Sequence, residues 1–207
     1  MGGEGLAIVP LRLGHAVVLY TFYRMPSAKT VAGWDAATPA GFTFVLKAPQ
    51  RIMHIARLRN VDEPLRFFLD TARALGPKLG PMLFQLPPNF KKDTALLGDL
   101  LTQFPADLRC AWEFRHPSWF GDDVYALLRT GNAALCVADT DEGTTPLEAT
   151  ADFGYVRLRD EGYAKKDLEQ WAERVRAQAW SDAFVFFKHE EKGEGPKLAA
   201  QFAAALF

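Results

Sequence analysis

The sequence predicts an α/β fold in which parallel strands alternate with helices. Apolar runs of roughly five to eight residues alternate with amphipathic stretches of roughly ten to fifteen, which is the pattern of repeated β/α units. The expected strands are apolar on both faces, as in a sheet that is covered by helices. Because the chain has 207 residues, of which 49% are hydrophobic, we expect a single domain spanning residues 1–207.

In the N-terminal half, β-branched and aromatic residues mark the strands, while caps and glycine-proline stops mark the helices. Ser27 is the expected cap of a first helix that ends near Ala36. A second helix is expected to begin near Asp62 and to stop at Gly76-Pro77. A long basic loop is expected at 50–60. The expected strands are 16–23, 42–47 and 81–86, preceded by a short apolar run at 6–9.

In the C-terminal half the same alternation continues. Gly131 is the expected left-handed stop of a helix at 122–130, and a polar loop is expected at 139–151. The expected strands are 109–114, 133–138, 153–159 and 183–188, and the other expected helices are 93–104, 167–178 and 197–207.

Polar residues near the strand ends favour a TIM-like β/α barrel over a doubly wound sheet. Barrel enzymes build their sites where the C-terminal ends of all strands meet, whereas an open sheet concentrates polar groups at one switch point. In this chain such residues recur on nearly every strand: Lys47, Gln85, Glu113, Arg115, Asp139, Arg157, Arg159 and His189. We therefore predict a TIM-like barrel with about seven visible parallel strands. The first strand is not followed by Gly-x-Gly-x-x-Gly, which weakens a dinucleotide-binding interpretation.

Composition argues against several classes of protein. A net charge of −1 disfavours a broad nucleic-acid-binding surface. No apolar run is long enough to cross a bilayer, and the N-terminus lacks the pattern of a signal peptide, so we expect a cytoplasmic protein. Cys110 and Cys136 lie in apolar runs, which fits a reducing compartment. No zinc-binding spacing is present, and the sequence does not identify a cofactor. A metal held by Asp139, Glu113 and a histidine stays open, although the spacing of these residues does not support it.

Six short sequence features, separated along the chain, are informative when they are taken together. They are T-F-Y-R-M-P (21–26), R-I-M-H (51–54), Q-L-P-P-N-F (85–90), E-F-R-H-P-S-W (113–119), Asp139 and F-F-K-H-E (186–190). In this order they resemble the YecE-like family, a domain-of-unknown-function family (number seventy-two), from about Val17 to the C-terminus. The resemblance implies a TIM-like barrel and carries no settled activity.

The chain departs from the pattern of this family in two places. The glycine-rich first strand of the family, roughly G-T-S-G-W, has no match, so the chain is expected to begin one β/α unit late, or to have a truncated start. Where the next strand of the family has Glu and Asn, this chain has Val17 and Leu19, both expected to point into the barrel mouth. A missing first strand would leave an open sheet edge. The run at 6–9 would partly fill this edge, or a second copy of the chain would cover it as a homo-oligomer.

The stretch 111–119 carries the best candidate site. Side chains alternate along a strand, so Glu113 and Arg115 should share one face, while Trp112 and Phe114 face the helices. Glu113 is the candidate general acid or base. Burial would move its pKa toward neutrality, whereas a cation such as Arg115 would hold the pKa down. The alternative is a structural Glu–Arg ion pair.

Other residues at the expected rim supply cations, proton carriers and hydrogen-bonding groups. Arg115, Arg157 and Lys47 would hold a phosphate or carboxylate, unless each pairs with a neighbouring acid. His116 and His189 are candidate proton carriers, although His116 would alternatively cap its loop. The other candidate ligand contacts are His54, Gln85, Asp139 and Tyr23, of which Gln85 and Asp139 would alternatively satisfy local backbone groups.

Three functions remain open at this point. The first is an enzyme of hydrolase or lyase type acting on a small anionic, phosphorylated substrate, with Glu113 as acid/base and His116 or His189 as its partner. The second is a degenerate barrel that binds a metabolite or protein without turnover. The third is nucleic-acid binding through the basic loop, which the near-neutral charge makes least favourable.

Overall fold

In this computed structural model, the structure describes residues 7–10, 20–23, 25–160, 162–187 and 194–206. Strands and helices alternate in the described residues, as the sequence predicts. The longer elements are β1 (Ala7–Pro10), α1 (Ala28–Ala36), α2 (Asp62–Arg73), β2 (Met82–Gln85), α3 (Thr94–Thr102), β3 (Cys110–Glu113), α4 (Asp122–Thr130), β4 (Ala134–Thr140), β5 (Gly143–Thr144), β6 (Phe153–Leu158), α5 (Lys165–Arg176), β7 (Asp182–Phe187) and α6 (Glu194–Leu206). Short helical turns lie at Tyr20–Phe22, Arg51–Ile55, Gly76–Lys78 and Pro117–Trp119.

The strands form one sheet in the order β1-β7-β6-β4-β3-β2, with β5 paired to β4. Neighbouring strands from β7 to β2 run parallel. Two isolated parallel bridges, Phe44 with Leu79 and Lys47 with Leu83, place the segment 44–47 beyond β2. The short apolar run expected at 6–9 forms β1, which pairs antiparallel with β7. The chain therefore has an α/β fold with a mainly parallel sheet.

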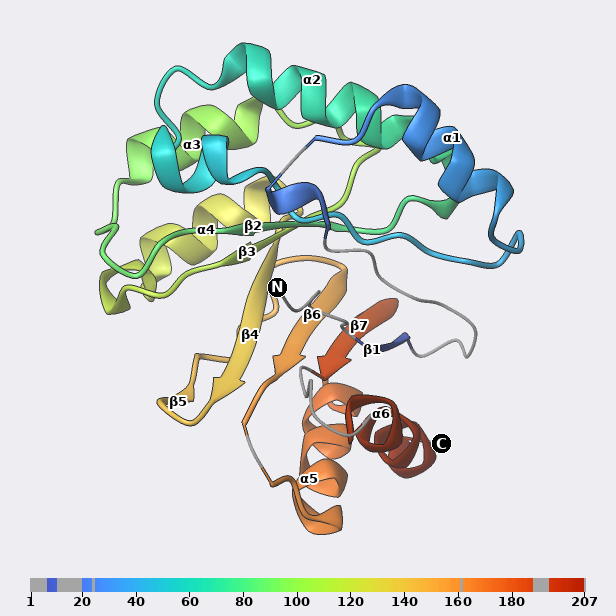
Figure 1. The fold of residues 1–207 in the computed structure, drawn as a ribbon. Coiled ribbons are helices and arrows are strands. Elements are labelled where there is room, and N and C mark those ends of the chain that lie inside the picture. The colour runs from blue at the N-terminus through green and yellow to red at the C-terminus, as the bar shows by residue number, and fades with distance from the viewer. Residues whose placement is uncertain (1–6, 11–19, 24, 161, 188–193, 207) are drawn as a thin grey trace.

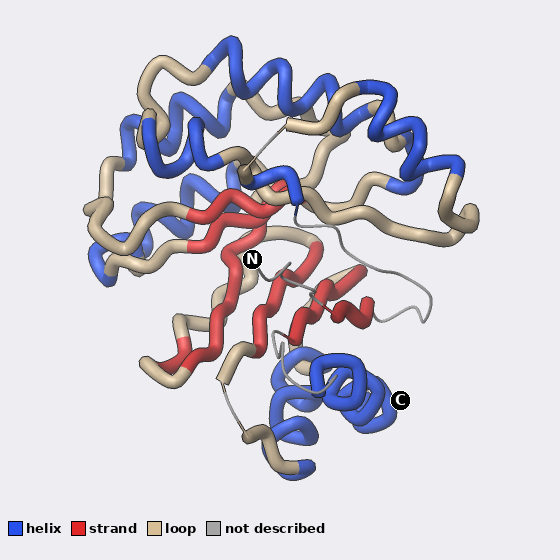
Figure 2. The backbone as a smooth tube through the Cα atoms, viewed as in Figure 1, coloured by secondary structure: helices blue, strands red, loops and turns tan. Residues whose placement is uncertain are grey.

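Helices cover the outer face of this sheet in two groups (Figure 1). α1 to α4 pack over β2 and β3, and their shared core includes Phe68, Phe84 and Trp112. α5 and α6 pack over β6 and β7, with Phe187 and Phe202 in their core. Figure 2 shows the two groups at opposite ends of the molecule, one near β2 and β3 and the other near β6 and β7. No helix in the described part of the chain is both long and apolar enough to cross a membrane.

The other face of the sheet, called here the inner face, carries a third apolar cluster that contains no helical residue. Its buried members are Val45, Leu83, Ala111, Ala134, Cys136, Phe153, Tyr155, Phe184 and Phe186. Side chains alternate along a strand, so residues two positions further on also point to the inner face. These residues are Lys47, Gln85, Glu113, Ala138 and Arg157. A polar layer thus lies directly next to an apolar one.

The segment 42–47 is not the continuous strand that the sequence predicts. The neighbouring segment, 79–83, includes Pro81, which has no N–H group to donate to the hydrogen-bond ladder of the sheet. The N–H groups of Gly80 and Leu83 donate to the carbonyl groups of Phe44 and Leu46, each at 2.8 Å, on either side of this interruption. The pairing is therefore reduced to isolated bridges.

Three further local expectations are corrected. The expected loop at 50–60 contains a π-helix, Arg51–Ile55. The expected polar loop at 139–151 contains β5, which folds back on β4. Gly131 does not adopt the left-handed conformation, with φ −90°. Instead the next residue, Asn132, does so with φ 45°. Its side-chain oxygen accepts from the Asp152 N–H at 2.9 Å, which fits the tolerance of asparagine for this region.

Most of the strand expected at 16–23, including Val17 and Leu19, lies outside the described residues. Within it, Tyr20–Phe22 forms a 3-10 turn. Ser27 caps α1 as predicted, because its hydroxyl oxygen accepts from the Thr30 N–H at 3.1 Å.

Gly154 in β6 is required by close packing. A Cβ at this position would overlap the ring of Trp180. We expect Gly154→Ala to lower the free energy of unfolding by about 1–3 kcal/mol in urea denaturation, because the ring or the strand must move. Gly33→Ala in α1 is the control, since a Cβ there meets nothing within 4 Å, and it should raise stability by about 0.5–1 kcal/mol. Equal effects of the two substitutions would contradict this account.

Candidate functional site

Glu113 is a buried carboxylate at the C-terminal end of a strand. It is the last residue of β3 and is 1% exposed. Trp112 and Phe114 belong to the core under the helices, so the predicted alternation of faces along this stretch is confirmed. The inner-face neighbour of Glu113 on the same strand is Ala111, whose small side chain belongs to the apolar cluster. The carboxylate therefore lies between an apolar layer and the strand ends.

Three side chains donate hydrogen bonds to this carboxylate. The Nε2 atom of Gln85, its neighbour in register on β2, donates to Oε1 at 2.5 Å. The Nε atom of Arg115 donates to the same oxygen at 3.4 Å. The Nη1 atom of Arg157, from β6, donates to Oε2 in an ion pair whose two side chains are almost fully buried. One negative charge is thus shared by two guanidinium groups.

Small residues on β4 allow the ion pair to form. β4 lies between β3 and β6 in the sheet, so Arg157 must reach across it to meet Glu113. The inner face of β4 carries Ala134, Cys136 and Ala138. Larger side chains at these positions would occupy the space through which the arginine extends.

The ion pair determines the protonation state of Glu113. Burial alone raises the pKa of a carboxyl group. At Glu113 the positive charges of Arg157 and Arg115, together with the hydrogen bonds from Gln85 and Arg157, outweigh burial and lower the pKa to about 2. Burial lowers the pKa of Arg157, but the charge of Glu113 raises it further, so the net shift is upward. Both groups are therefore ionised at neutral pH.

A second group of side chains adjoins this pair. The Nζ atom of Lys47 lies 4.0 Å from the centroid of the Phe22 ring. The ring of His54 meets the same phenylalanine edge-on, with the centroids 5.1 Å apart. Burial lowers the pKa of His54, as do the charges of Lys47, Arg115 and Arg57, against a hydrogen bond to the backbone of Gln85 that raises it. His54 is therefore mainly neutral at neutral pH.

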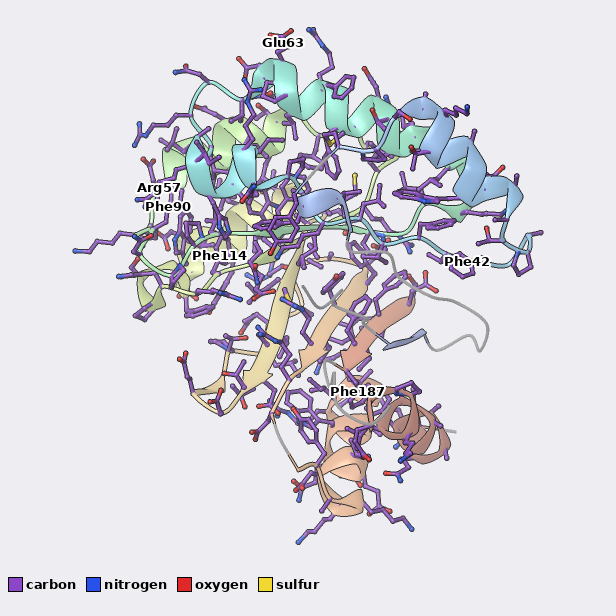
Figure 3. All side chains as sticks on the ribbon, in the orientation of Figure 1. Phe42, Arg57, Glu63, Phe90, Phe114 and Phe187 are labelled. Carbon is purple, nitrogen blue, oxygen red and sulfur yellow. The ribbon has the colours of Figure 1, made fainter. Side chains whose placement is uncertain are left out.

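The segment that carries His54 is held by the loop after β2. The π-helix at Arg51–Ile55 leads into a turn in which Arg57, Leu58 and Asn60 all have positive φ. Arg57 donates to the side chain of Asn89 at 3.1 Å and lies 5.9 Å from the ring centroid of Phe90. Figure 3 shows Arg57 and Phe90 beside each other at one edge of the molecule. Part of the basic stretch thus contributes to packing.

A cavity of ≈ 510 Å³ opens beside Glu113. Glu113, Arg115 and Arg159 line one side of it. The other lining residues include the β4–β5 hairpin and the residues after it, from Thr140 to Pro146. Asp141 and Glu142 belong to this hairpin, so the cavity carries acidic as well as basic side chains.

The structure brings together six of the residues predicted from the sequence. Gln85, Glu113, Arg115 and Arg157 are joined by hydrogen bonds, and Lys47 and His54 meet through Phe22. Tyr23 is close to this group, with its ring 5.0 Å from that of Phe22 and 72% of its surface exposed.

Other predicted residues lie elsewhere or have local roles. The Nδ1 atom of His116 accepts from the Ser118 N–H at 3.2 Å and caps the turn Pro117–Trp119, which was the alternative interpretation. Asp139 accepts from the hydroxyl groups of Thr144 and Tyr163 and lines a separate cavity of ≈ 260 Å³. His189 lies outside the described residues. Among the described residues, no three histidine, cysteine, aspartate or glutamate side chains gather as metal ligands.

The sequence-based selection missed three parts of this region. Arg159 was noted at a strand end but was not selected, although it follows Arg157 by two positions and lines the cavity. Phe22, which contacts both Lys47 and His54, was not selected because an aromatic residue in an apolar run indicates core. The hairpin wall had a weak signal in Gly143, whose φ of +124° marks a tight turn.

Comparison with known proteins identifies relatives of unknown function. A model of the family described as "Protein of unknown function DUF72" matches residues 18–207. UPF0759 protein YecE of Escherichia coli (strain K12) is 33% identical over 112 residues, which are 53% of this chain and 41% of YecE. UPF0759 protein YunF of Bacillus subtilis (strain 168) is 24% identical over 228 residues, covering 90% of this chain and 80% of YunF. The match to YecE thus spans less than half of that protein.

Two solved structures share the fold. A DUF72 family protein from Enterococcus faecalis V583 superposes with a TM-score of 0.78 at 21% identity, over 94% of this chain and 90% of that chain. A DUF72 family protein from Thermotoga maritima MSB8 superposes with a TM-score of 0.74 at 23% identity, over 95% and 85%.

Removing the charge of Glu113 should strongly destabilise the protein. In Glu113→Gln the buried guanidinium of Arg157 loses its counter-charge. We expect a loss of about 3–5 kcal/mol in the free energy of unfolding, measured by urea denaturation. Glu148→Gln is the matched control, because Glu148 pairs with Arg129 at the surface, 2.7 Å apart, where such pairs contribute about 0–1 kcal/mol. Similar losses in the two variants would refute a buried ion pair.

The contribution of Glu113 to stability should also depend on pH. Its folded-state pKa of about 2 lies below the ordinary value of 4.5. A lowered carboxyl pKa stabilises the folded state fully above the ordinary value, and this stabilisation is lost as the pH falls toward the folded-state value. The difference in unfolding free energy between wild type and Glu113→Gln should therefore shrink as the pH falls below 4.5. A difference that stays constant down to the acid limit would rule out this linkage.

Proposed function

The chain belongs to the DUF72 family, whose function is unknown, and from this premise we propose that it binds a small anionic ligand, such as a phosphorylated metabolite, at the C-terminal ends of its strands. One observation carries the proposal. A single buried carboxylate, Glu113, faces the guanidinium groups of both Arg157 and Arg115. This arrangement places two guanidinium groups on one carboxylate, and one of them, that of Arg115, lies at the edge of a cavity.

The architecture that we propose for this site is a TIM-like barrel formed by one domain, residues 1–207. Three features support it. Helices lie on the outer face of the sheet, an apolar cluster fills the inner face, and the polar layer lies toward the C-terminal ends of parallel strands. Enzymes and binding proteins with this barrel place their sites at that end.

Further cations support an anionic ligand. The side chain of Arg115 is 35% exposed although it contacts Glu113, and Arg159 lines the same cavity. Lys47 and Arg57 act electrostatically on His54, as Arg115 does. Arginine presents a planar set of donors that matches phosphate and carboxylate oxygens. A bound anion would contact Arg115 and Arg159, the two cations that line the cavity, rather than Asp141 and Glu142.

The electrostatics favour binding over acid/base catalysis by Glu113. A general acid must carry a proton at working pH, and an effective general base has a pKa near that pH. A pKa of about 2 meets neither condition. We therefore assign Glu113 the role of positioning the two arginines.

Nucleic-acid binding through the basic stretch gains no support, since Arg57 and Arg59 contact Asn89 and Asp93 within the fold.

Thermal melting with a panel of anions tests this function. We expect inorganic phosphate, glycerol 3-phosphate or AMP to raise the melting temperature of the wild type. A ligand at 100 times its Kd adds about 2.7 kcal/mol, which corresponds to about 5–10 °C for a chain of this size. Arg115→Gln should abolish the rise, whereas Arg129→Gln, in a surface ion pair with Glu148, should retain it. Cooperative melting of the wild type that no anion shifts would contradict the proposal.

A further inference from the structure

The cavity beside Glu113 carries charges of both signs. Arg115 and Arg159 line it together with Asp141 and Glu142, the two residues between β4 and β5, called here the hairpin tip. The remaining charged residue of the lining, Glu113, is already engaged by two guanidinium groups. A ligand in this cavity therefore meets two arginines and the two carboxylates of the hairpin tip.

The carboxylates of the hairpin tip have no ion-pair partner in the described part of the chain. Both side chains are exposed. Arg115 and Arg159 line the same cavity, yet neither forms a salt bridge with the hairpin tip. Glu148, by contrast, pairs with Arg129 at 2.7 Å. Both charges of the hairpin tip are therefore available to a ligand.

The hairpin tip is held in place by the strand that precedes it. Thr140 pairs with Gly143, and its hydroxyl group donates to the carbonyl oxygen of Gly143 at 3.2 Å. Further along the hairpin, the Ala138 N–H donates to the hydroxyl oxygen of Thr145 at 2.8 Å, and the Thr145 N–H donates to the Ala138 carbonyl at 2.9 Å. Because these bonds restrain the backbone around the tip, less conformational entropy is lost when a ligand contacts it.

A simple anion does not match this cavity. An oxyanion that contacts Arg115 and Arg159 shares the site with the two carboxylates of the hairpin tip, and like charges repel each other. The volume of ≈ 510 Å³ lies within the range of small-molecule sites, about 300–1,000 Å³, and is much larger than one phosphate group. The cavity therefore has room for a second charged group on the ligand.

We propose that the ligand is a zwitterion, that is, an oxyanion that also carries an ammonium group, such as an amino sugar phosphate. Arg115 and Arg159 bind the oxyanion, and the hairpin tip binds the ammonium group. An ammonium group only donates hydrogen bonds and an ionised carboxylate only accepts them, so the two are complementary. Pro88, Phe120 and Pro146 also line the cavity and supply apolar contacts for the carbon skeleton. This inference rests on the proposed anion-binding function.

Two sugar phosphates that differ in one group test the inference. Glucosamine 6-phosphate carries an ammonium group where glucose 6-phosphate carries a hydroxyl group, and the rest of the two molecules is the same. Titration calorimetry is done at low ionic strength and slightly below neutral pH, where the amino group is protonated. The wild type should bind glucosamine 6-phosphate about two- to tenfold more tightly, the range that one or two partly exposed charge pairs supply. Added salt should reduce this preference, because salt screens exposed charges.

A double variant and a matched control make the outcome specific. Asp141→Asn/Glu142→Gln removes both charges of the hairpin tip and keeps the side-chain sizes. It should lose the preference and bind glucose 6-phosphate more tightly than the wild type does, because the repulsion is gone. Asp62→Asn/Glu63→Gln makes the same change in an exposed acidic pair at the start of α2. Figure 3 shows Glu63 far from Phe114, which lines the cavity, so this control should keep the full preference.

The possible failures are distinguishable. If the wild type binds the two sugar phosphates equally, or if Asp141→Asn/Glu142→Gln keeps the preference, the hairpin tip does not bind an ammonium group, while anion binding stands. The same holds if the wild type binds inorganic phosphate but neither sugar phosphate. If the folded wild type binds none of these three anions, both the anion-binding function and the inference built on it are wrong.

Discussion

The buried ion pair of Glu113 and Arg157 is the interaction on which the inner face of this protein depends. Removing two charges from water costs several kcal/mol for each, and a buried pair persists only when its remaining hydrogen-bonding capacity is satisfied. Gln85 and Arg115 satisfy it here, and β4 makes room for it by presenting only small side chains between the partners. Four adjacent strands must therefore lie in their observed register for the pair to form.

The same pair organises the electrostatics of the candidate site. The carboxylate of Glu113 neutralises the positive charge of Arg157, so this buried arginine serves mainly as a structural ion-pair partner. Arg115 shares the same carboxylate and remains partly exposed at the cavity. Burial, together with the charges of Lys47, Arg115 and Arg57, lowers the pKa of His54. One buried acid thus fixes two arginines, of which Arg115 reaches the cavity and also acts on His54.

Local patterns predicted most of the elements and six of the residues that the candidate site brings together, and long-range contacts explain the remainder. Because side chains alternate along a strand, the sequence of β3 predicted that Glu113 faces away from the side of Trp112 and Phe114. The polar residues Gln85 and Arg157 were identified because they lie near the ends of predicted strands. Histidine and aspartate are common functional residues, yet His116 and Asp139 form hydrogen bonds within the fold, with Ser118 and Tyr163 respectively. Pro81 interrupts the pairing of 42–47 only because the two segments are neighbours in space. Asn132, rather than Gly131, turns the chain because Asp152 lies within reach of its side chain. None of these partners can be identified from spacing alone.

The left-handed turn after the π-helix has a consequence for attempts to stabilise this protein. Glycine would relieve the backbone at Arg57 and Leu58, yet the chain retains an arginine bonded to Asn89 and a leucine that is 4% exposed. Natural proteins commonly keep conformational penalties of this kind where rigidity or position serves their activity. A search for more thermostable variants would select changes in this turn early, and those same changes would loosen the segment that orients His54. Heat resistance and the placement of His54 should therefore trade against each other in this protein, and this turn is where engineering would meet that limit.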